Sequence, residues 1–219
     1  MTIEQLISPS VPQLAFQDTV RKALSVMEEN SITQLPLVNE GKYVSLILED
    51  NLIDWDKPES TLNAAEFLEY KPAVFAQGHP FEALRVANRQ HLSILPVVDG
   101  ENTYLGAITQ DDLLKYITEN SGVDNPGGII VIEVAPRDYS LSEIARICEN
   151  EEVSIISLQL HNGAEGKLEI TLKTNRSNLS ALANSFERHS LTVKEVYGEQ
   201  VNYDDTMSRY GLLMNYLNM

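Results

Sequence analysis

Residues 33–52 (TQLPLVNEGKYVSLILEDNL) and residues 93–113 (SILPVVDGENTYLGAITQDDL) repeat one pattern, and this repeat decides the fold. Upstream, residues 12–38 align without a gap with residues 72–98, at a constant offset of 60. One extra residue in the turn DGENT shifts the offset to 61 for the remainder. A register that holds over about 40 residues and breaks only inside a turn indicates a duplicated structural unit.

Each copy predicts the order strand, helix, strand, strand, helix. Residues 20–27 and 81–87 carry apolar side chains at helical spacing. The runs LPLV and LPVV are typical of short buried strands, and NEGK and DGENT are typical of turns between hairpin strands. Asp50 and Asp111 stand near the start of the following helices, where acidic side chains suit the positive helix end. Neither copy buries much core alone, so we expect the two to pack together.

The charge balance excludes several classes of partner. Thirty-two acidic residues against 16 basic ones give a net charge of −16, which argues against a nucleic-acid surface and an anionic membrane face. The longest apolar run, GIIVI near residue 130, is far shorter than the roughly 20 residues of a membrane span. The start, MTIEQLISPS, lacks the pattern of a secretory signal. The single cysteine, Cys148, fits a reducing compartment, so we expect a cytoplasmic protein.

The end of the second copy carries a candidate ligand site. A strand that ends at Thr109, before a helix that begins near Asp111, leaves backbone N–H groups that suit a phosphate. The Thr109 hydroxyl adds a donor, and Asp112 can accept two hydrogen bonds from a vicinal diol such as ribose. The same two residues could instead form a helix cap with no ligand.

The repeat resembles a tandem of cystathionine-β-synthase (CBS) domains over roughly residues 1–119, on the strand LPVVD and the run GAITQDDLL. The resemblance implies a regulatory pair that binds an adenine nucleotide (AMP, ADP or ATP). In such tandems the residues that match Thr109 and Asp112 contact phosphate and ribose. The resemblance places around the adenine the residues Ser93, Ile94, Pro96, Val74 and Phe75.

The first copy lacks this set of groups. Leu48 stands in place of Thr109 and cannot donate a hydrogen bond, and Asn51 stands in place of Asp112 and carries no charge. Ser45 replaces the glycine of the family pattern. We therefore expect the first site to be degenerate and the second to be the main nucleotide site.

Residues 120–128 (NSGVDNPGG) gather turn-forming residues, and the pattern beyond them predicts the order βαββαβ, that of a ferredoxin-like sandwich. This part resembles an ACT domain, and its place after the repeat is similar to the acetoin-utilisation type of CBS–ACT protein. ACT domains bind amino acids at the first strand–helix turn. Here that turn, APRDYSL, has Pro136 but no glycine, and Tyr139 occupies the space. We expect this module to serve dimerisation instead.

The sequence shows no catalytic constellation. His79, His91, His161 and His189 lack the spacing of metal ligands, and no phosphate-binding loop or paired cysteines occur. Cys148 faces inward on its predicted helix, as a core residue does. We therefore expect no enzyme.

The sequence thus predicts an α+β protein in five parts. These are a first CBS domain (1–60), a second (61–120), a linker (121–128), an ACT-like domain (129–200) and a C-terminal helix (201–219). The leading hypothesis is a cytoplasmic homodimer that senses an adenine nucleotide, uses no metal, and acts on an unidentified protein target. The alternative is a ligand-free structural dimerisation module that serves a protein partner.

Overall fold

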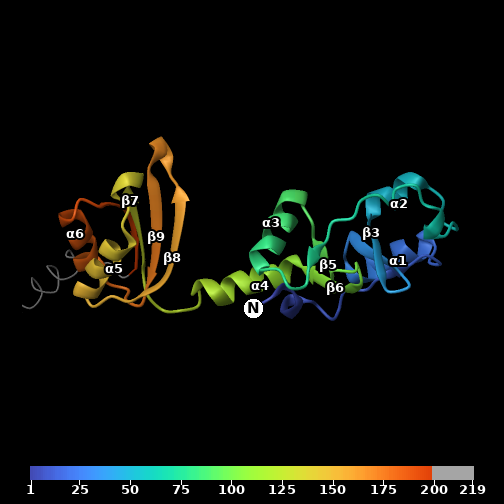
Figure 1. Cartoon of the computed structure of the whole chain (residues 1–219), viewed down its shortest axis with the longest axis horizontal. Helices are drawn as coiled ribbons and strands as arrows, with labels where there is room; N and C mark the ends of the chain where they lie inside the picture. Colours follow the sequence, from blue (N-terminus) through green and yellow to red (C-terminus); the bar gives the residue numbers. More distant parts are fainter. Residues whose placement is uncertain (199–219) are drawn as a thin grey trace, which may run out of the picture. The chain divides into compact units, whose positions relative to one another are not determined.

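The computed structural model describes residues 1–198 and divides into two units, Met1–Ile117 and a second that starts at Thr118 (Figure 1). The C-terminal helix expected at 201–219 lies outside the described residues. The first unit contains both copies of the repeat, and the second contains the ACT-like region.

Both copies have the predicted order of elements. The first copy comprises β1 (Leu14–Ala15), α1 (Val20–Asn30), β2 (Gln34–Asn39), β3 (Lys42–Leu48) and α2 (Glu49–Trp55). The second comprises β4 (Val74–Phe75), α3 (Pro80–Gln90), β5 (Ile94–Val98), β6 (Tyr104–Thr109) and α4 (Gln110–Ser121). Each forms a three-stranded sheet in which a short parallel strand flanks an antiparallel hairpin. Each hairpin also has a bulge at the same place, at Val44 and at Leu105.

The leading segment of each copy packs against the other copy. Ile3 and Leu6 lie in the core of the second copy, and the Ile3 N–H donates to the Gly78 carbonyl at 3.0 Å. Leu62, in the segment between the copies, lies in the core of the first, and its N–H donates to the Asp18 carbonyl at 2.9 Å. The sequence boundary at residue 60 therefore separates the two repeats but not the two cores, and neither core is complete without chain from the other copy.

Two tyrosines at equivalent positions meet at the seam between the copies. The rings of Tyr43 and Tyr104 stack with centroids 6.5 Å apart. The Tyr43 hydroxyl donates to the Pro72 carbonyl at 2.9 Å, whereas the buried Tyr104 hydroxyl has no partner within residues 1–198. Burial raises the pKa of both phenols, that of Tyr104 to about 12. The expected packing of the two copies against each other is therefore observed.

The second unit follows the predicted order βαββαβ. Its elements are β7 (Ile129–Val134), α5 (Leu141–Asn150), β8 (Ile155–Asn162), β9 (Leu168–Thr174), α6 (Ser180–Arg188) and β10 (Thr192–Tyr197). The four strands form an antiparallel sheet in the order β10-β7-β9-β8. Alternate residues of β7, namely Ile130, Ile132 and Val134, face α5 and α6, which lie together on one side of the sheet (Figure 1).

Candidate functional site

Thr109 and Asp112 bond each other at the junction of β6 and α4. The Thr109 N–H and hydroxyl both donate to Oδ2 of Asp112, at 2.9 and 2.6 Å. The Asp112 N–H donates back to the Thr109 hydroxyl oxygen at 3.1 Å. This is a reciprocal helix cap, and it leaves Oδ1 of Asp112 without a protein partner in the described chain and not fully buried. Oδ1 is therefore the oxygen that a diol could reach.

The strand register brings most of the expected adenine residues to the same face as Thr109. Ile94 lies directly opposite Thr109 across the β5–β6 hairpin, so the two side chains project from one face of the sheet. Pro96 is two residues further along β5 and shares that face, as does Phe75, which lies opposite Val98. Phe75 is 58% exposed. The geometry thus groups Ile94, Pro96 and Thr109, with Phe75 at the far end of the strand.

Val74 projects from the opposite face. It pairs with Val97 and packs in the core of the second copy, where it is 2% exposed. Because its side chain is enclosed by core residues, any contact between Val74 and a ligand would go through its backbone. The sequence could not show this, since β4 has only two residues and alternation cannot be read from so short a strand.

Ser93 lies at the start of β5, and a residue that the sequence reading missed holds it there. The Ser93 carbonyl accepts the Gln110 N–H at 3.1 Å, which ties the start of β5 to the start of α4. The N–H groups of Ser93 and Ile94 donate to Oε1 of Gln34, at 3.0 and 3.3 Å. The Ser93 hydroxyl oxygen is buried without a partner in the described chain. Gln34, at the start of β2, could have been noticed as the polar counterpart of Ile94 in the repeat.

The equivalent corner of the first copy has the same backbone path and different chemistry. The Glu49 N–H donates to the Thr33 carbonyl at 2.9 Å, as Gln110 does to Ser93. Leu48 precedes α2 without a side-chain cap and packs against the core of the second copy. Asn51 makes no hydrogen bond like that of Asp112 among the described residues. This corner lacks the hydroxyl and the carboxylate that the second copy provides.

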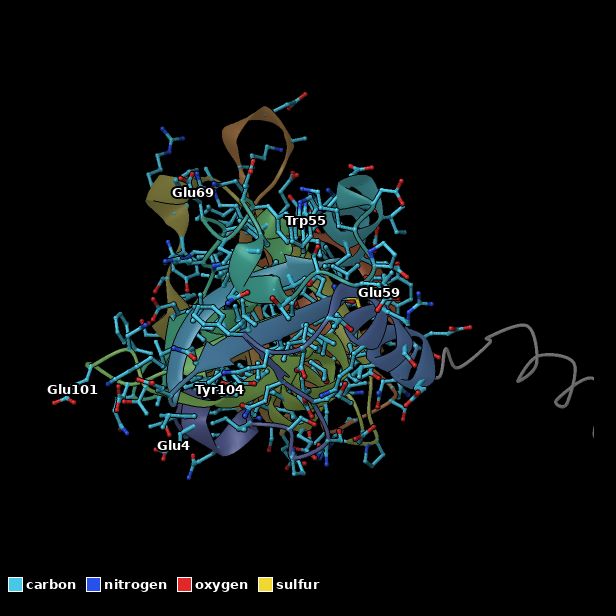
Figure 2. The ribbon with its side chains drawn as sticks, turned by 90° about the vertical axis from the view of Figure 1, so that its right-hand side faces the viewer. Glu4, Trp55, Glu59, Glu69, Glu101 and Tyr104 are labelled. Carbon is cyan, nitrogen blue, oxygen red and sulfur yellow. The ribbon has the colours of Figure 1, made fainter. Side chains whose placement is uncertain are left out.

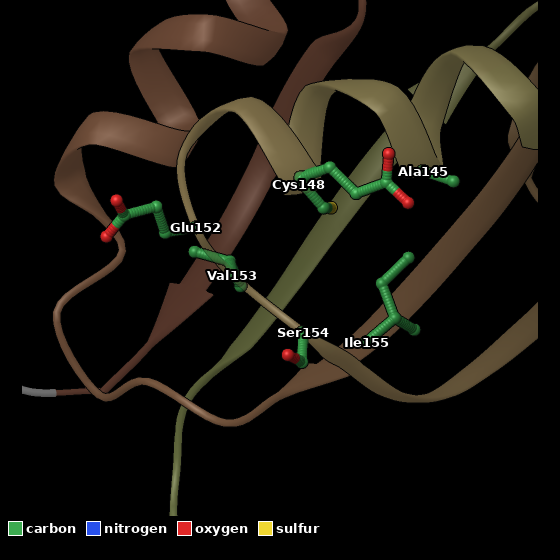
Figure 3. A pocket seen from close by; sticks show the side chains of 7 residues that line it. Ala145, Cys148, Glu152, Val153, Ser154 and Ile155 are labelled. Carbon is green, nitrogen blue, oxygen red and sulfur yellow. The ribbon is translucent and has the colours of Figure 1, made fainter.

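The second unit has a separate hollow of about 510 Å³ between the end of α5 and the start of β8 (Figure 3). Cys148 and Val153 line it, together with the carboxylates of Glu149 and Glu152. Burial raises the pKa of the Cys148 thiol to about 11, and Cys148 is 1% exposed. A thiol in this state is protonated at neutral pH and is a poor nucleophile. The expectation that Cys148 is a core residue is confirmed.

The strand–helix turn of the second unit is filled by protein. Residues Pro136–Asp138 form one turn of 3₁₀ helix, and Tyr139 packs against the core beneath it. The Ser140 hydroxyl then accepts the Glu143 N–H at 3.3 Å and caps α5. The turn therefore carries an aromatic ring that is partly buried against the core of this unit.

Several acidic side chains of the first unit are exposed on its surface. Figure 2 shows the carboxylates of Glu4, Glu59, Glu69 and Glu101 pointing outward, away from Tyr104. No group of three His, Cys, Asp or Glu side chains within residues 1–198 is arranged to hold a metal ion. None of the helices in that range is long and apolar enough to cross a membrane.

Comparison with known families agrees with the repeat. The family model described as "CBS domain" matches residues 3–57 and 72–119, which are the two copies. The chain therefore contains a tandem pair of CBS domains. This result places the Thr109–Asp112 pair at the end of the second of two CBS domains, at the point where its last strand meets its last helix.

Two curated relatives come from Methanocaldococcus jannaschii. Inosine-5'-monophosphate dehydrogenase is 28% identical over 164 residues, which are 73% of this chain and 32% of that enzyme. An uncharacterised protein is 29% identical over 152 residues, which are 58% of this chain and 54% of that protein. The chain thus spans between about a third and about half of the length of these relatives.

Solved structures with similar folds are more distant. A CBS domain pair/ACT domain protein of Thermotoga maritima is 22% identical with a TM-score of 0.48, and the match covers 54% of this chain and 98% of that one. The structure of CBSX2 in complex with AMP is 17% identical with a TM-score of 0.48, and the match covers 54% of this chain and 96% of that one.

Proposed function

We propose that this protein is a non-catalytic regulatory protein that binds an adenine nucleotide in its CBS pair, mainly at the second-copy corner. The observation that carries the proposal is the Thr109–Asp112 pair, which lies beside Ile94 and Pro96 and has no counterpart at Leu48. One copy of a duplicated unit has kept a hydroxyl and a carboxylate at a strand–helix junction, and the other has not. A ligand with an anionic group and a diol explains that difference.

The chemistry of the corner fits the two polar parts of a nucleotide. Oδ1 of Asp112 can accept hydrogen bonds from a ribose diol. The positive end of α4 and the Thr109 hydroxyl suit a phosphate. Ile94 and Pro96 share the Thr109 face but are buried, so the exposed Phe75 on that face is the apolar side chain that a base can reach directly. AMP, ADP and ATP share these features, and the corner does not discriminate among them.

A second candidate is a ligand-free structural module that dimerises for a protein partner. The reciprocal hydrogen bonds of Thr109 and Asp112 favour it, because they satisfy the Thr109 hydroxyl and Oδ2 of Asp112 without a ligand. The two candidates differ in one measurable property, which is whether adenine nucleotides bind the folded protein.

Binding to the wild type and to two variants tests the proposal. Millimolar AMP, ADP or ATP should raise the melting temperature, because a ligand that binds only the folded state stabilises it. Asp112→Ala removes an acceptor of two charge-assisted hydrogen bonds, so the affinity should fall roughly tenfold to a hundredfold. Thr109→Val keeps the shape and loses the donor, and should cost about 1 kcal/mol of binding free energy.

Both variants also weaken the cap of α4, so affinity is measured by calorimetry at a temperature where circular dichroism shows each variant to be folded. A wild type that shows neither a melting shift nor heat of binding with any of the three nucleotides would leave the structural module as the function.

The remaining parts of the proposal concern assembly and location. The second unit acts as an ACT-type dimerisation module of the acetoin-utilisation type, since Tyr139 fills the turn at which an amino acid would bind. The protein forms a homodimer in the cytoplasm, and nucleotide binding changes its contacts with a protein target. Its net charge of −16 repels polyanions, which supports the proposal that neither nucleic acid nor an anionic membrane is a partner.

A further inference from the structure

Gln34 connects the two copies at the corner where the nucleotide is proposed to bind. It belongs to β2 of the first copy, yet its Oε1 lies 3.0 Å from the backbone nitrogen of Ser93 and 3.3 Å from that of Ile94. Both of these residues are in the second copy, and Ile94 lies directly opposite Thr109. The first copy thus supplies a side chain to the second-copy corner.

The orientation of the Gln34 amide is fixed by its partners. Two backbone N–H groups face it, and these can only donate, so the amide oxygen must point toward them and the nitrogen away. Nε2 then carries two hydrogens and has no hydrogen-bond partner in the described chain. Within residues 1–198, the side-chain atoms that are both fully buried and unpaired are the hydroxyl oxygens of Ser93 and Tyr104. Nε2 of Gln34 is unpaired and is not one of these atoms, so it is not fully buried. Nε2 is therefore an oriented, accessible donor.

We propose that Gln34 is a specificity-determining residue of the second-copy site, and that its Nε2 donates a hydrogen bond to N1 of the adenine base. The inference rests on the proposed nucleotide-binding function and goes beyond it by naming the group that reads the base. The residues proposed to contact phosphate and ribose do not distinguish one nucleobase from another. An oriented donor can distinguish adenine from hypoxanthine and guanine. N1 of adenine accepts a hydrogen bond, whereas N1 of hypoxanthine and guanine carries a hydrogen and cannot accept one.

The chain offers a matched substitution that separates this role from a structural one. Gln34→Glu keeps an oxygen that accepts the N–H groups of Ser93 and Ile94, and replaces the NH₂ donor with an acceptor. The added negative charge weakens the binding of every nucleotide. The ratio of the affinities for AMP and IMP cancels that effect, because the two ligands carry the same ribose and phosphate and differ only at the base.

The experiment measures the Kd values of AMP and IMP for the full chain by calorimetry. The wild type should prefer AMP, and in Gln34→Glu the ratio in favour of AMP should fall by about tenfold or more, as expected when one specific hydrogen bond is replaced by a mismatch. Gln34→Met, which is of similar length and has neither the charge nor the donor, should also lose the preference. The Gln34→Met variant therefore still tests the proposal if the Gln34→Glu variant does not fold.

The outcomes separate this inference from the proposed function. Binding of AMP by both wild type and Gln34 variants with an unchanged AMP-to-IMP ratio would overturn the role of Gln34 and leave nucleotide binding intact. No binding of either nucleotide to the wild type would overturn the proposed function, and the inference with it. A uniform loss for both ligands, without a change in ratio, would reduce Gln34 to a structural link between the copies.

Discussion

Gly106 and Ile7 approach so closely that a side chain at position 106 would meet Cγ2 of Ile7 at 2.3 Å. Gly106 lies in β6 with a φ of +147°, and the N-terminal segment crosses the strand there, where the Ser8 N–H donates to the Ala107 carbonyl at 2.9 Å. The equivalent residue of the first copy, Ser45, has a hydroxyl that donates to the Tyr70 carbonyl at 2.9 Å. Position 106 therefore needs a glycine, because the N-terminal segment at Ile7 and Ser8 crosses β6 there without room for a side chain.

Gly106→Ala should destabilise the protein by about 2–6 kcal/mol. Backbone strain at a positive φ contributes about 1–3 kcal/mol, and the clash with Ile7 adds a comparable amount. Urea unfolding followed by circular dichroism measures the loss. Gly41→Ala is the matched control, since Gly41 has a φ of +77° and no atom within 4 Å of the added carbon. Equal losses for the two variants would show that the crossing does not constrain position 106.

Asn51→Ala should leave the affinity for adenine nucleotides within about twofold of wild type, while Asp112→Ala lowers it by tenfold or more. The reason is that the first-copy corner has no cap hydroxyl at Leu48 and no carboxylate at position 51. Calorimetric titration of both variants checks the contrast. A loss at Asn51→Ala as large as that at Asp112→Ala would mean that the site is assigned to the wrong copy.

The free energy of unfolding should decrease as the pH rises above about 9. Burial raises the pKa of Cys148 from 9.0 to about 11 and that of Tyr104 from 10.0 to about 12. Between the ordinary and the raised pKa, the unfolded chain has released a proton that the folded chain still holds, so stability falls with pH. Each group contributes at most about 1.4 kcal/mol per pH unit in its window.

Chemical denaturation at pH 8, 9, 10 and 11 measures this slope. Cys148→Ala should make the slope shallower between pH 9 and pH 10, where the tyrosines of the unfolded chain are at most about half ionised. A slope that is the same in wild type and Cys148→Ala would contradict the assignment to the buried thiol.

The chain should sediment as a homodimer or a larger symmetric assembly. Ile53 of α2 and Leu114 of α4 occupy equivalent positions in the two copies and are 58% and 65% exposed. A combined Ile53→Glu and Leu114→Glu variant should shift the assembly toward the monomer, because charges on an apolar contact oppose association. A mass of 24.5 kDa at all concentrations of wild type would contradict the prediction. Dissociation caused by Leu141→Glu, on α5, would instead assign the interface to the second unit.

The sequence predicted the features of the fold that follow from the spacing of apolar residues and from the internal repeat. The constant offset gave two copies with the same order of elements, and the switch of pattern after residue 128 gave the βαββαβ order of the second unit. The helix cap at Thr109 and Asp112 was the alternative that the sequence left open, and the spacing of three at a helix start agrees with the reciprocal bonds that the structure has there. These features depend on contacts that are local in the chain or repeated in it.

The rest depends on packing between segments that are distant in sequence. The two-residue strand β4 did not reveal that Val74 faces the core, because alternation needs a longer run. The reach of Gln34 to Ser93 and Ile94 crosses 59 and 60 residues, and no local pattern encodes it. The exchange of leading segments between the two cores was likewise invisible, since Ile3 and Leu62 look like ordinary apolar residues.

The Thr109 hydroxyl has one hydrogen, and in this structure it donates that hydrogen to Oδ2 of Asp112. Under the proposed function, a phosphate that takes this hydrogen has to displace a carboxylate already held within the chain. A cap worth about 1 kcal/mol weakens the apparent affinity for the nucleotide by roughly fivefold. The strength of the cap therefore sets the nucleotide concentration at which the protein responds, and substitutions that tighten α4 at its first turn would raise that threshold without touching the ligand.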